Sequence, residues 1–239
     1  MALFSGKTIL VTGASGGVGG AIARKLGEEG ATVCLSGRNR ERLHQVASAL
    51  PKGSAQSYPA DLTSEKDLQS TVESILAKNP RIDAVIHGAA IIALAPIATA
   101  SAEDFDRQFQ TNVRAPFRLT QLLLPTLTSA QGQIIFINSS AGRTAQAGVS
   151  QYAATKHALR AVADSLREEC NAAGVRVCSI FLGATATSMQ AAVRAEQKRP
   201  YKPELLIQPE DVAGVVSSLL ALPRTAEITD VIMRPMTKT

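Results

Sequence analysis

The sequence predicts an α/β fold, a doubly wound, seven-stranded parallel sheet with helices on both faces. Short apolar or β-branched runs alternate with longer amphipathic stretches along the whole chain, and this alternation is typical of repeated βαβ units. A hydrophobic content of 45% over 239 residues is enough for one substantial core. Because no linker, internal repeat or low-complexity tract divides the chain, we expect a single domain over residues 1–239.

Seven short runs have the composition of buried strands and supply the sheet. They are Thr8 to Val11, Thr32 to Ser36, Ala55 to Tyr58, Ala84 to His87, Gln133 to Ile137, Arg176 to Phe181 and Asp230 to Met233. Amphipathic stretches between them predict helices, among them Ala21 to Glu29 and Thr63 to Lys78. The second helix is expected to open with Thr63 as its N-cap, and Glu65 and Asp67 in its first turn suit the positive end of the helix dipole. In such a sheet, ligands bind beyond the carboxyl ends of the strands, so functional residues should follow strands.

Segments that would export the chain or place it in a membrane are not found in the sequence. No run of about twenty apolar residues occurs, and the first residues enter a strand-like segment without the three regions of a signal peptide. The three cysteines form no C-x-x-C pair, and two of them lie in apolar runs, where a thiol is usually a small core residue. We therefore expect a cytoplasmic protein, no membrane partner, and reduced structural cysteines at Cys34, Cys170 and Cys178.

The charge and the histidines argue against nucleic acid and against metal. The formal net charge is +5 and the pI is near 9.3, but the lysines and arginines are scattered and do not cluster on one helix or tail. An aromatic content of 4% is too low for a surface on which bases stack. His44, His87 and His157 are isolated from acids and thiols, so no metal site is expected. These features favour a mildly basic enzyme with anionic ligands.

A glycine-rich turn follows the first strand, with the sequence Thr12-Gly13-Ala14-Ser15-Gly16-Gly17-Val18-Gly19. Gly13 permits a tight turn, Gly17 lets the backbone approach a pyrophosphate, and Gly19 allows the next helix to pack closely on the strand. The N-terminus of that helix offers free N–H groups and the positive end of its dipole. The strand before the turn and the helix after it favour a dinucleotide site in a Rossmann fold over a plain loop. We expect the cofactor to contact Gly13, Ser15, Gly17, Val18 and Gly19.

The end of the second strand carries no acid, which bears on the choice of cofactor. An acid at this place usually bonds the ribose hydroxyls of NAD and repels the 2′-phosphate of NADP. Here the sequence is Ser36-Gly37-Arg38-Asn39, and the guanidinium of Arg38 is a planar, permanently charged donor suited to phosphate. We therefore expect NADP(H) as the cofactor. The alternative is a solvated arginine at the start of the next helix, beside Arg40 and Arg42.

Tyr152 and Lys156 are candidates for proton transfer. Their i, i+4 spacing puts both on one face of the long helix expected after the fifth strand. A free tyrosine titrates near ~10, and a nearby ammonium lowers this pKa because it stabilises the phenolate. Taken alone, such a pair is more often a structural tyrosine beside a solvated lysine. Ser139, which follows the fifth strand thirteen positions before Tyr152, favours the catalytic interpretation.

Taken together, these motifs resemble the short-chain dehydrogenase/reductase family, in its short single-domain branch. The similarity covers nearly the whole chain through Thr-Gly-x-x-x-Gly-x-Gly at Thr12 to Gly19, Asp61-Leu62, Asn112, Ser139, and Tyr-x-x-x-Lys at Tyr152 to Lys156. Several motifs in the same order and at matching spacing are far more specific than any one of them. The resemblance implies a catalytic tetrad of Asn112, Ser139, Tyr152 and Lys156.

The resemblance also implies a role for each member of the tetrad. Tyr152 would donate a proton to the carbonyl oxygen during reduction, while Ser139 hydrogen-bonds that oxygen. Lys156 would lower the pKa of the tyrosine and bind the nicotinamide ribose, and Asn112 would help to hold a water that links the lysine to solvent. The other cofactor contacts expected are Asp61 near the adenine, Thr187 near the nicotinamide amide, and Leu62, Ala89, Tyr152 and Gly183.

Three places depart from the family's pattern. The usual Asn-Asn-Ala-Gly after the fourth strand is His87-Gly88-Ala89-Ala90 here, so the side-chain bonds of those asparagines are missing or replaced. The Pro-Gly after the sixth strand is Leu182-Gly183, which removes a rigid residue but leaves Gly183 and Thr187 in register. The last strand continues as Arg234-Pro235, without the Asp-Gly-Gly that is common among reductases of acyl carrier protein substrates. In these respects the chain is more similar to NADP(H)-dependent reductases of small carbonyl compounds.

The sequence therefore predicts a carbonyl reductase or alcohol dehydrogenase for a small, largely apolar substrate, and the family resemblance implies a homodimer or homotetramer. Candidate walls of the substrate pocket are Ile91, Ile92 and Leu94, Ala141 to Val149, and Met189 to Val193. A 3-oxoacyl-[acyl-carrier-protein] reductase is an alternative, and it would need a basic docking surface near the entrance. A non-catalytic NADP(H)-binding regulator is another; the segment His87 to Ala90 favours it, and the complete Asn-Ser-Tyr-Lys set disfavours it.

Overall fold

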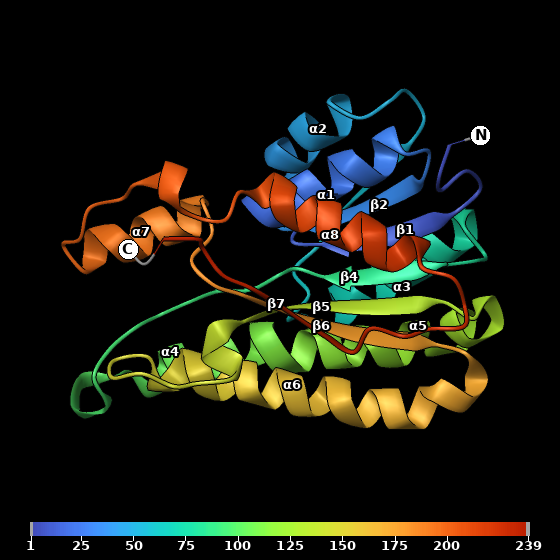
Figure 1. The fold of residues 1–239 in the computed structure, drawn as a ribbon. Helices are drawn as coiled ribbons and strands as arrows, with labels where there is room; N and C mark the ends of the chain where they lie inside the picture. The colour runs from blue at the N-terminus through green and yellow to red at the C-terminus, as the bar shows by residue number, and fades with distance from the viewer. Residues whose placement is uncertain (1, 238–239) are drawn as a thin grey trace.

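The computed structural model describes residues 2–237, and one seven-stranded sheet forms its centre (Figure 1). The strands are β1 (Thr8–Thr12), β2 (Thr32–Gly37), β3 (Ala55–Pro59), β4 (Ala84–His87), β5 (Gln133–Ser139), β6 (Arg176–Leu182) and β7 (Asp230–Met233). All neighbours pair in parallel, in the order β3-β2-β1-β4-β5-β6-β7. The chain builds outward from β1 to β3 and then returns to the other side of β1, so the strand order reverses between β1 and β4. The predicted doubly wound α/β fold is confirmed.

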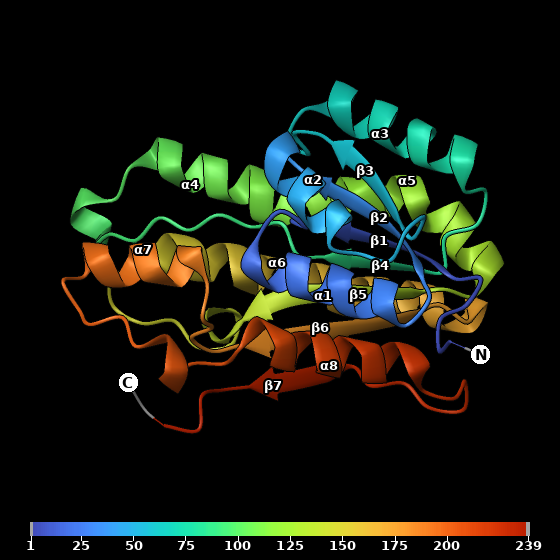
Figure 2. The same ribbon diagram turned by 90° about the horizontal axis from the view of Figure 1, so that it is seen from above.

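Eight α-helices within residues 2–237 surround the sheet. They are α1 (Gly17–Glu28), α2 (Arg40–Ser48), α3 (Glu65–Lys78), α4 (Ala102–Phe109), α5 (Ala115–Ala130), α6 (Ser150–Cys170), α7 (Ser188–Glu196) and α8 (Pro209–Ala221). Figure 1 shows α1, α2 and α8 on one face of the sheet and α3, α5 and α6 on the other. Helices α4 and α7 both lie beyond the carboxyl ends of the strands in both views, apart from each other (Figure 2).

Alternate residues of each strand pack against opposite faces of the sheet, which gives the molecule two cores. In β1, Ile9 and Val11 pack with α1 and α8, whereas Leu10 packs with α3, α5 and α6. In β5, Ile135 and Phe136 divide between the two cores in the same way. Continuous apolar runs of this kind are expected for parallel strands that are covered on both faces.

The seven predicted strands are all present, and most are slightly longer than the sequence indicated. The bounds of β4 and β7 are as predicted, and the others extend by one or two residues at the carboxyl end. The largest extension is in β5, because Asn138 and Ser139 pair with Phe181 and Leu182 of β6. Ser139 is therefore the last residue of the strand and not the residue that follows it.

Helix α3 begins later than predicted, and its N-cap is Ser64 instead of Thr63. The Ser64 hydroxyl accepts a hydrogen bond from the backbone N–H of Asp67 at 3.3 Å. Thr63 is unavailable because its backbone N–H and its hydroxyl both donate to Asp61 Oδ1, at 3.0 and 2.8 Å. Glu65 and Asp67 lie in the first turn as expected.

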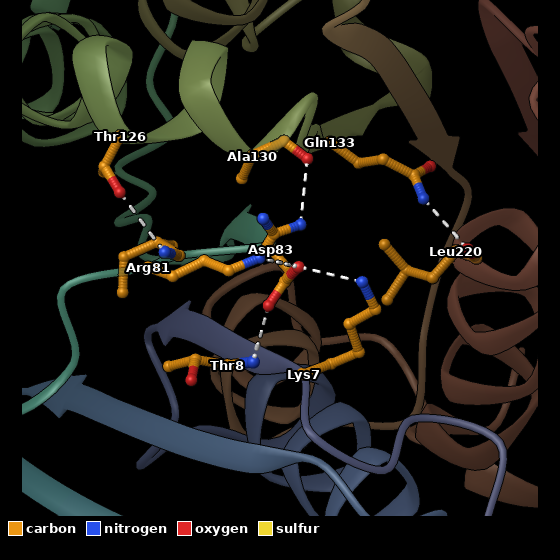
Figure 3. Close-up of polar contacts among 9 residues, drawn as sticks. Lys7, Thr8, Arg81, Asp83, Thr126, Ala130, Gln133 and Leu220 are labelled. Carbon is orange, nitrogen blue, oxygen red and sulfur yellow. Dashed lines mark hydrogen bonds and ion pairs between the residues drawn. The ribbon is translucent and has the colours of Figure 1, made fainter.

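A polar network joins the amino ends of three central strands, at the edge of the sheet away from the carboxyl ends (Figure 3). The carboxylate of Asp83, just before β4, accepts from the backbone N–H of Thr8 at 3.0 Å, from Lys7 Nζ at 3.0 Å and from Arg81 Nε at 2.9 Å. Its backbone carbonyl accepts from the N–H of Gln133, at the start of β5, at 2.9 Å. Burial would raise the pKa of Asp83, but these hydrogen bonds outweigh it and hold the pKa below its usual value. The network therefore anchors the register of β1, β4 and β5.

All three cysteines are buried and free, as expected for core residues. Burial raises the pKa of Cys34 and of Cys178 to about 12, so both thiols stay protonated at neutral pH. Within residues 2–237, none of the helices has both the length and the apolar character needed to cross a membrane.

Candidate active site

A cleft of about 830 Å³ lies at the carboxyl ends of the strands, where the strand order reverses between β1 and β4. The loops that follow β1 to β6 line it, together with parts of α6 and α7. The predicted site residues that line the cleft are Gly13, Ser15, Gly17, Val18, Gly19, Arg38, Asp61, Leu62, Ala89, Ser139, Tyr152, Lys156, Gly183 and Thr187. Asn112 does not line the cleft and is buried behind it.

The turn after β1 forms a tight cradle of backbone. Helix α1 begins at Gly17, four residues before the predicted start, because the turn runs directly into the helix. Gly13 has a φ of +68°, and a Cβ there would lie 2.7 Å from the carbonyl carbon of Gly88. A Cβ on Gly19 would collide with the carbonyl oxygen of Gly13, and one on Gly17 would lie 2.9 Å from Cγ2 of Thr187. Close approach of neighbouring atoms therefore requires glycine at these places.

The first turn of α1 presents free amide groups. Its N-cap, Gly16, is extended and has no side chain that could cap the helix, and Gly20 N–H donates to Gly16 O at 2.7 Å. The N–H groups of Gly17, Val18 and Gly19 precede the first intrahelical partners, and no side chain of the described residues caps them. Together with the positive end of the helix dipole, these groups make a site for a phosphate or pyrophosphate.

The hydroxyl of Thr12 ties the end of β4 to the glycine turn. It accepts hydrogen bonds from the backbone N–H groups of Gly88 at 3.1 Å and Ala89 at 3.2 Å, and it donates to Ile86 O at 3.4 Å. The backbone of Gly88 and Ala89 therefore lines the cleft without the side chains that the family usually has there.

The His87 side chain packs in the core and not in the cleft. Its ring stacks on Phe136 with the centroids 4.8 Å apart, and Nε2 lies 2.9 Å from Thr120 Oγ1. Because the Thr120 hydroxyl donates to Pro116 O at 2.8 Å, Nε2 of His87 carries the proton and donates to Thr120. Nδ1 is left as a buried acceptor with no hydrogen-bond partner among the described residues. Burial lowers the pKa of His87 to about 3, so the ring is neutral.

The end of the cleft beside β2 and β3 carries charged side chains. Arg38 follows β2 and Asp61 follows β3, and both are exposed. The hydrogen bond from the Thr63 N–H holds the pKa of Asp61 below its usual value, and Coulombic attraction to Arg38 adds to this. Arg42 also lines this end of the cleft, whereas the sequence indicated only a solvated neighbour of Arg38. Its place in the first turn of the helix that follows Arg38 was the available signal.

Three polar side chains converge from β5 and α6. A hydrogen bond joins the side chains of Ser139 and Tyr152. Lys156 Nζ donates to Ile137 O at 3.1 Å and lies 5.8 Å from the centre of the Tyr152 ring. The structure thus brings Ser139, Tyr152 and Lys156 together at the wall of the cleft.

Burial controls the proton equilibria of this group. It raises the pKa of the Tyr152 phenol to about 12, although the hydrogen bond with Ser139 acts in the opposite direction. It lowers the pKa of Lys156 to about 8. The expectation that the lysine would bring the tyrosine pKa below its usual value is therefore wrong for this structure, because desolvation of the phenolate dominates. At neutral pH the phenol keeps its proton and can donate it.

Asn112 lies in a π-helical turn, Gln110–Arg114, between α4 and α5. Its Oδ1 accepts from the N–H of Ile91 at 2.9 Å, and its Nδ2 donates to Ile91 O at 2.9 Å and to Thr155 Oγ1 at 3.1 Å. The Asn112 side chain therefore holds the loop after β4 against the helix that carries Tyr152. Single π-helical turns of this kind occur often at functional sites.

Asn138 belongs to the site and was not among the residues predicted from the sequence. Its Oδ1 accepts from the Ser139 N–H at 2.7 Å, and its Nδ2 donates to Lys156 O at 3.2 Å. It therefore connects the strand that ends in Ser139 with the helix that carries Lys156. A polar residue at the end of an otherwise apolar strand was the available signal.

Apolar side chains form most of the remaining wall. Ile91, Ile92 and Leu94 line the cleft from the loop after β4, and Met189 and Val193 line it from α7. From the segment Ala141 to Val149, the residues that line the cleft are Ala141, Thr144, Gln146 and Val149. The predicted walls thus contribute to one pocket, which also contains polar groups.

A doubly wound parallel sheet with a glycine cradle at its switch point and a Ser-Tyr-Lys group in the same cleft defines a dinucleotide-dependent oxidoreductase. The chain belongs to the short chain dehydrogenase family, whose model matches residues 7–198. The resemblance inferred from the sequence motifs is confirmed.

Known relatives and solved structures extend the similarity over nearly the whole chain. An uncharacterized oxidoreductase of Staphylococcus aureus (strain USA300) is 30% identical over 237 residues, which are 99% of this chain and 100% of that protein. A metagenomic short-chain oxidoreductase in complex with NADP is 31% identical, with a TM-score of 0.84 over 99% of this chain and 100% of that one. A putative short chain dehydrogenase from Escherichia coli CFT073, complexed with NADPH, is 32% identical, with a TM-score of 0.88 over 97% of this chain and 98% of that one.

Proposed function

We propose that the protein is an NADP(H)-dependent reductase of small ketones or aldehydes, which also oxidises the corresponding alcohols. The observation that carries the proposal is the one cleft that joins the glycine cradle of α1 to the group of Ser139, Tyr152 and Lys156. A dinucleotide that extends along this cleft would bring its reactive end to a phenol that can give up a proton. The proposal rests on the site, because one fold supports many activities.

The shape and charge of the cleft fit NADP(H). The amide groups at Gly17, Val18 and Gly19 would hold the pyrophosphate, and Arg38 with Arg42 would hold the 2′-phosphate. The remaining contacts would be Gly13 and Ser15 in the turn, Asp61 and Leu62 near the adenine, and Ala89, Gly183 and Thr187 in the nicotinamide half. When bound, the cofactor supplies the hydride donor or acceptor. The structural relatives crystallised with NADP or NADPH support this choice of cofactor.

The proposed roles of the four polar residues combine their environments with the family resemblance. Tyr152 donates the proton to the carbonyl oxygen, since its raised pKa keeps the phenol protonated at neutral pH. The Ser139 hydroxyl hydrogen-bonds the same oxygen and stabilises the alkoxide charge that develops on it. Lys156 stabilises the phenolate that remains and would reach the nicotinamide ribose. For Asn112, the structure supports holding the loop after β4 against α6, and the family resemblance adds the role of helping to hold a water that links Lys156 to solvent.

The substrate is small and largely apolar. Ile91, Ile92 and Leu94 on one side and Met189 on the other offer it apolar contacts. Gln146 is a polar side chain on the same walls, suited to a hydroxyl or a second carbonyl group on the substrate.

The test is the oxidation of NADPH, followed by its absorbance, against ketones, aldehydes and acyl thioesters. Turnover of free ketones or aldehydes supports the proposal. Turnover that depends on an acyl carrier protein would assign the protein instead to the 3-oxoacyl reductases. Tight NADPH binding without turnover over the whole panel would assign it a regulatory role.

We also propose that the protein is cytoplasmic and assembles as a homodimer or homotetramer. Three exposed phenylalanines on neighbouring helices, Phe105 and Phe109 of α4 and Phe117 of α5, support the assembly, because large apolar side chains at the surface favour contact with another protein. Sedimentation or size-exclusion chromatography with light scattering gives the mass directly, and a monomer at micromolar concentration would contradict the proposal.

A further inference from the structure

Two glutamines connect a wall of the pocket to the helix that carries Tyr152. Gln108, in α4, is fully buried, with 0% of its surface exposed. Its Oε1 accepts from the N–H of Ala93 at 3.1 Å, and its Nε2 donates to Gln151 Oε1 at 3.3 Å. Gln151, the residue before Tyr152, donates from its own Nε2 to Ser101 O at 2.5 Å. A chain of side-chain amides thus runs from the wall to the first turn of α6.

The wall needs such support because it has no regular secondary structure. Residues 88–96 belong to no helix or strand, so no ladder of backbone hydrogen bonds holds them. Ala93 lies between Ile92 and Leu94, whose side chains line the cleft. Asn112 holds Ile91 through both of its backbone groups, and Gln108 holds Ala93 two residues further along. Two buried amides therefore hold this wall in place.

Burial makes the geometry of the glutamine pair specific. A buried amide that loses its partner carries a penalty, so each polar atom of Gln108 favours the one arrangement in which both bonds form. One hydrogen bond goes to the wall and the other to α6, so together they fix the position of the wall relative to α6.

We propose that Gln108 and Gln151 are positioning residues that set the separation between the apolar wall and Tyr152, and so determine which carbonyl compounds reach the phenol. The inference rests on the proposed reductase function and goes beyond it. Both residues act through Ala93 and α6 and do not themselves line the cleft.

The first variant is Gln108→Met, which keeps a side chain of similar length in the core but removes both bonds. We expect the KM of the preferred small ketone to rise at least about tenfold, since tenfold is the factor that corresponds to the loss of one of the two buried hydrogen bonds. The preference for that ketone over a bulkier analogue should shrink, because the wall is no longer held. The Kd of NADPH should stay the same, and kcat should change less than KM.

Two further variants separate positioning from simple loss of packing. Gln151→Met removes the link to α6 but leaves Ala93 bonded to Gln108, so its effect on KM should be the smaller one. In Gln108→Glu, a protonated carboxyl group can accept from Ala93 and donate to Gln151, whereas an ionised one cannot donate. The KM defect of Gln108→Glu should therefore shrink as the pH falls.

The experiment measures kcat and KM for a series of ketones of increasing size, the Kd of NADPH, and the hydrogen exchange of the Ala93 amide by NMR. Gln110→Met, an exposed glutamine two residues away, is the matched control and should behave like the wild type. If Gln108→Met does not fold, Gln151→Met and Gln108→Glu decide the question. Size selectivity and KM that match the wild type in these variants, or a KM defect in Gln108→Glu that does not depend on pH, would overturn the inference. A wild type without activity on any carbonyl compound would instead overturn the proposed function, and this inference with it.

Discussion

The phenol of Tyr152 is buried and hydrogen-bonded to Ser139. Its pKa of about 12 means that it is protonated at neutral pH. Tyr152→Phe keeps the ring and its packing but removes the hydroxyl group that would donate the proton. We expect kcat for carbonyl reduction to fall by at least ~100-fold, the scale of general acid catalysis, with little change in the Kd of NADPH. Steady-state kinetics and a fluorescence titration with NADPH measure the two quantities. A variant that keeps most of the wild-type turnover would remove Tyr152 from the mechanism.

The second prediction at this scale concerns the charge of Lys156 in alcohol oxidation, which needs the phenolate. Below its pKa of about 8 the lysine is charged and stabilises the phenolate; as the pH rises through 8 it loses that charge. In Lys156→Met the oxidation rate should therefore rise at a higher pH than in the wild type. The difference in rate between the two proteins should become smaller above pH 8. The profile is measured at saturating cofactor, because loss of ribose contacts also weakens binding. A deficit of constant size across the pH range would show that the charge does not matter.

Cofactor choice is the third prediction, and it depends on Arg38. A hydrogen bond to a charged group is strong enough that Arg38→Leu should lower NADPH affinity roughly ten- to hundredfold and NADH affinity little. Arg40→Leu is the matched control, since Arg40 opens α2 but does not line the cleft. Adding Gly37→Asp to Arg38→Leu should shift the preference toward NADH but not complete the change. The reason is that a Cβ at Gly37 would lie 2.9 Å from Ser15 Oγ, so the Ser15 side chain must move. Wild-type kcat/KM values that favour NADH would contradict the assignment of NADP(H).

At the level of single elements, two helical glycines lead to opposite expectations. A Cβ on Gly214, inside α8, would meet nothing within 4 Å, whereas one on Gly17 in α1 would press on Thr187. Gly214→Ala should therefore raise the free energy of unfolding by about 0.5 to 1 kcal/mol and leave the kinetics unchanged. Gly17→Ala should weaken NADPH binding, because Thr187 caps α7 and forms part of the cleft. Urea unfolding and NADPH titration of both variants check these expectations.

The elements were largely predictable because each has a local cause. Alternation of apolar runs and amphipathic stretches located all seven strands, and the strand, turn and helix around Gly13 located the cradle. The errors lie at boundaries that depend on hydrogen bonds to residues outside the element itself. β5 continues to Ser139 because β6 pairs with it, and Thr63 loses the N-cap position because Asp61 takes its hydroxyl.

The site was predictable where motifs carry it and not where side chains pair across the fold. Gln108 and Gln151 are 43 residues apart, and no periodicity or spacing indicates that their amides meet. Asn138 likewise acquires its role only when β5 lies beside α6. The direction of the Tyr152 pKa depends on burial, which a sequence motif does not contain.

For the molecule as a whole, His87 links stability to pH. Its pKa is about 3 in the folded protein and 6.5 ordinarily, so between these values only the unfolded chain takes up the proton. The neutral, buried His87 therefore contributes fully to the free energy of unfolding above pH 6.5. Between pH 6.5 and about 3 this contribution falls by about 1.4 kcal/mol for each pH unit. His87→Asn should flatten the dependence of the unfolding free energy on pH between 6 and 4, whatever its stability at pH 7. The exposed His157→Asn is the control, and equal slopes in all three proteins would contradict the prediction.

The network around Asp83 and the cleft lie at opposite ends of β4, a strand of four residues that spans about 13 Å. Substitutions separated by more than about 7 to 10 Å and without shared partners usually have independent effects on stability. Changes among Ile91, Ile92 and Leu94 therefore leave the anchoring of the strands almost untouched. A lineage that inherits this sheet can acquire new substrates by small steps in the loops, and each step can be selected for activity without first being compensated in the core.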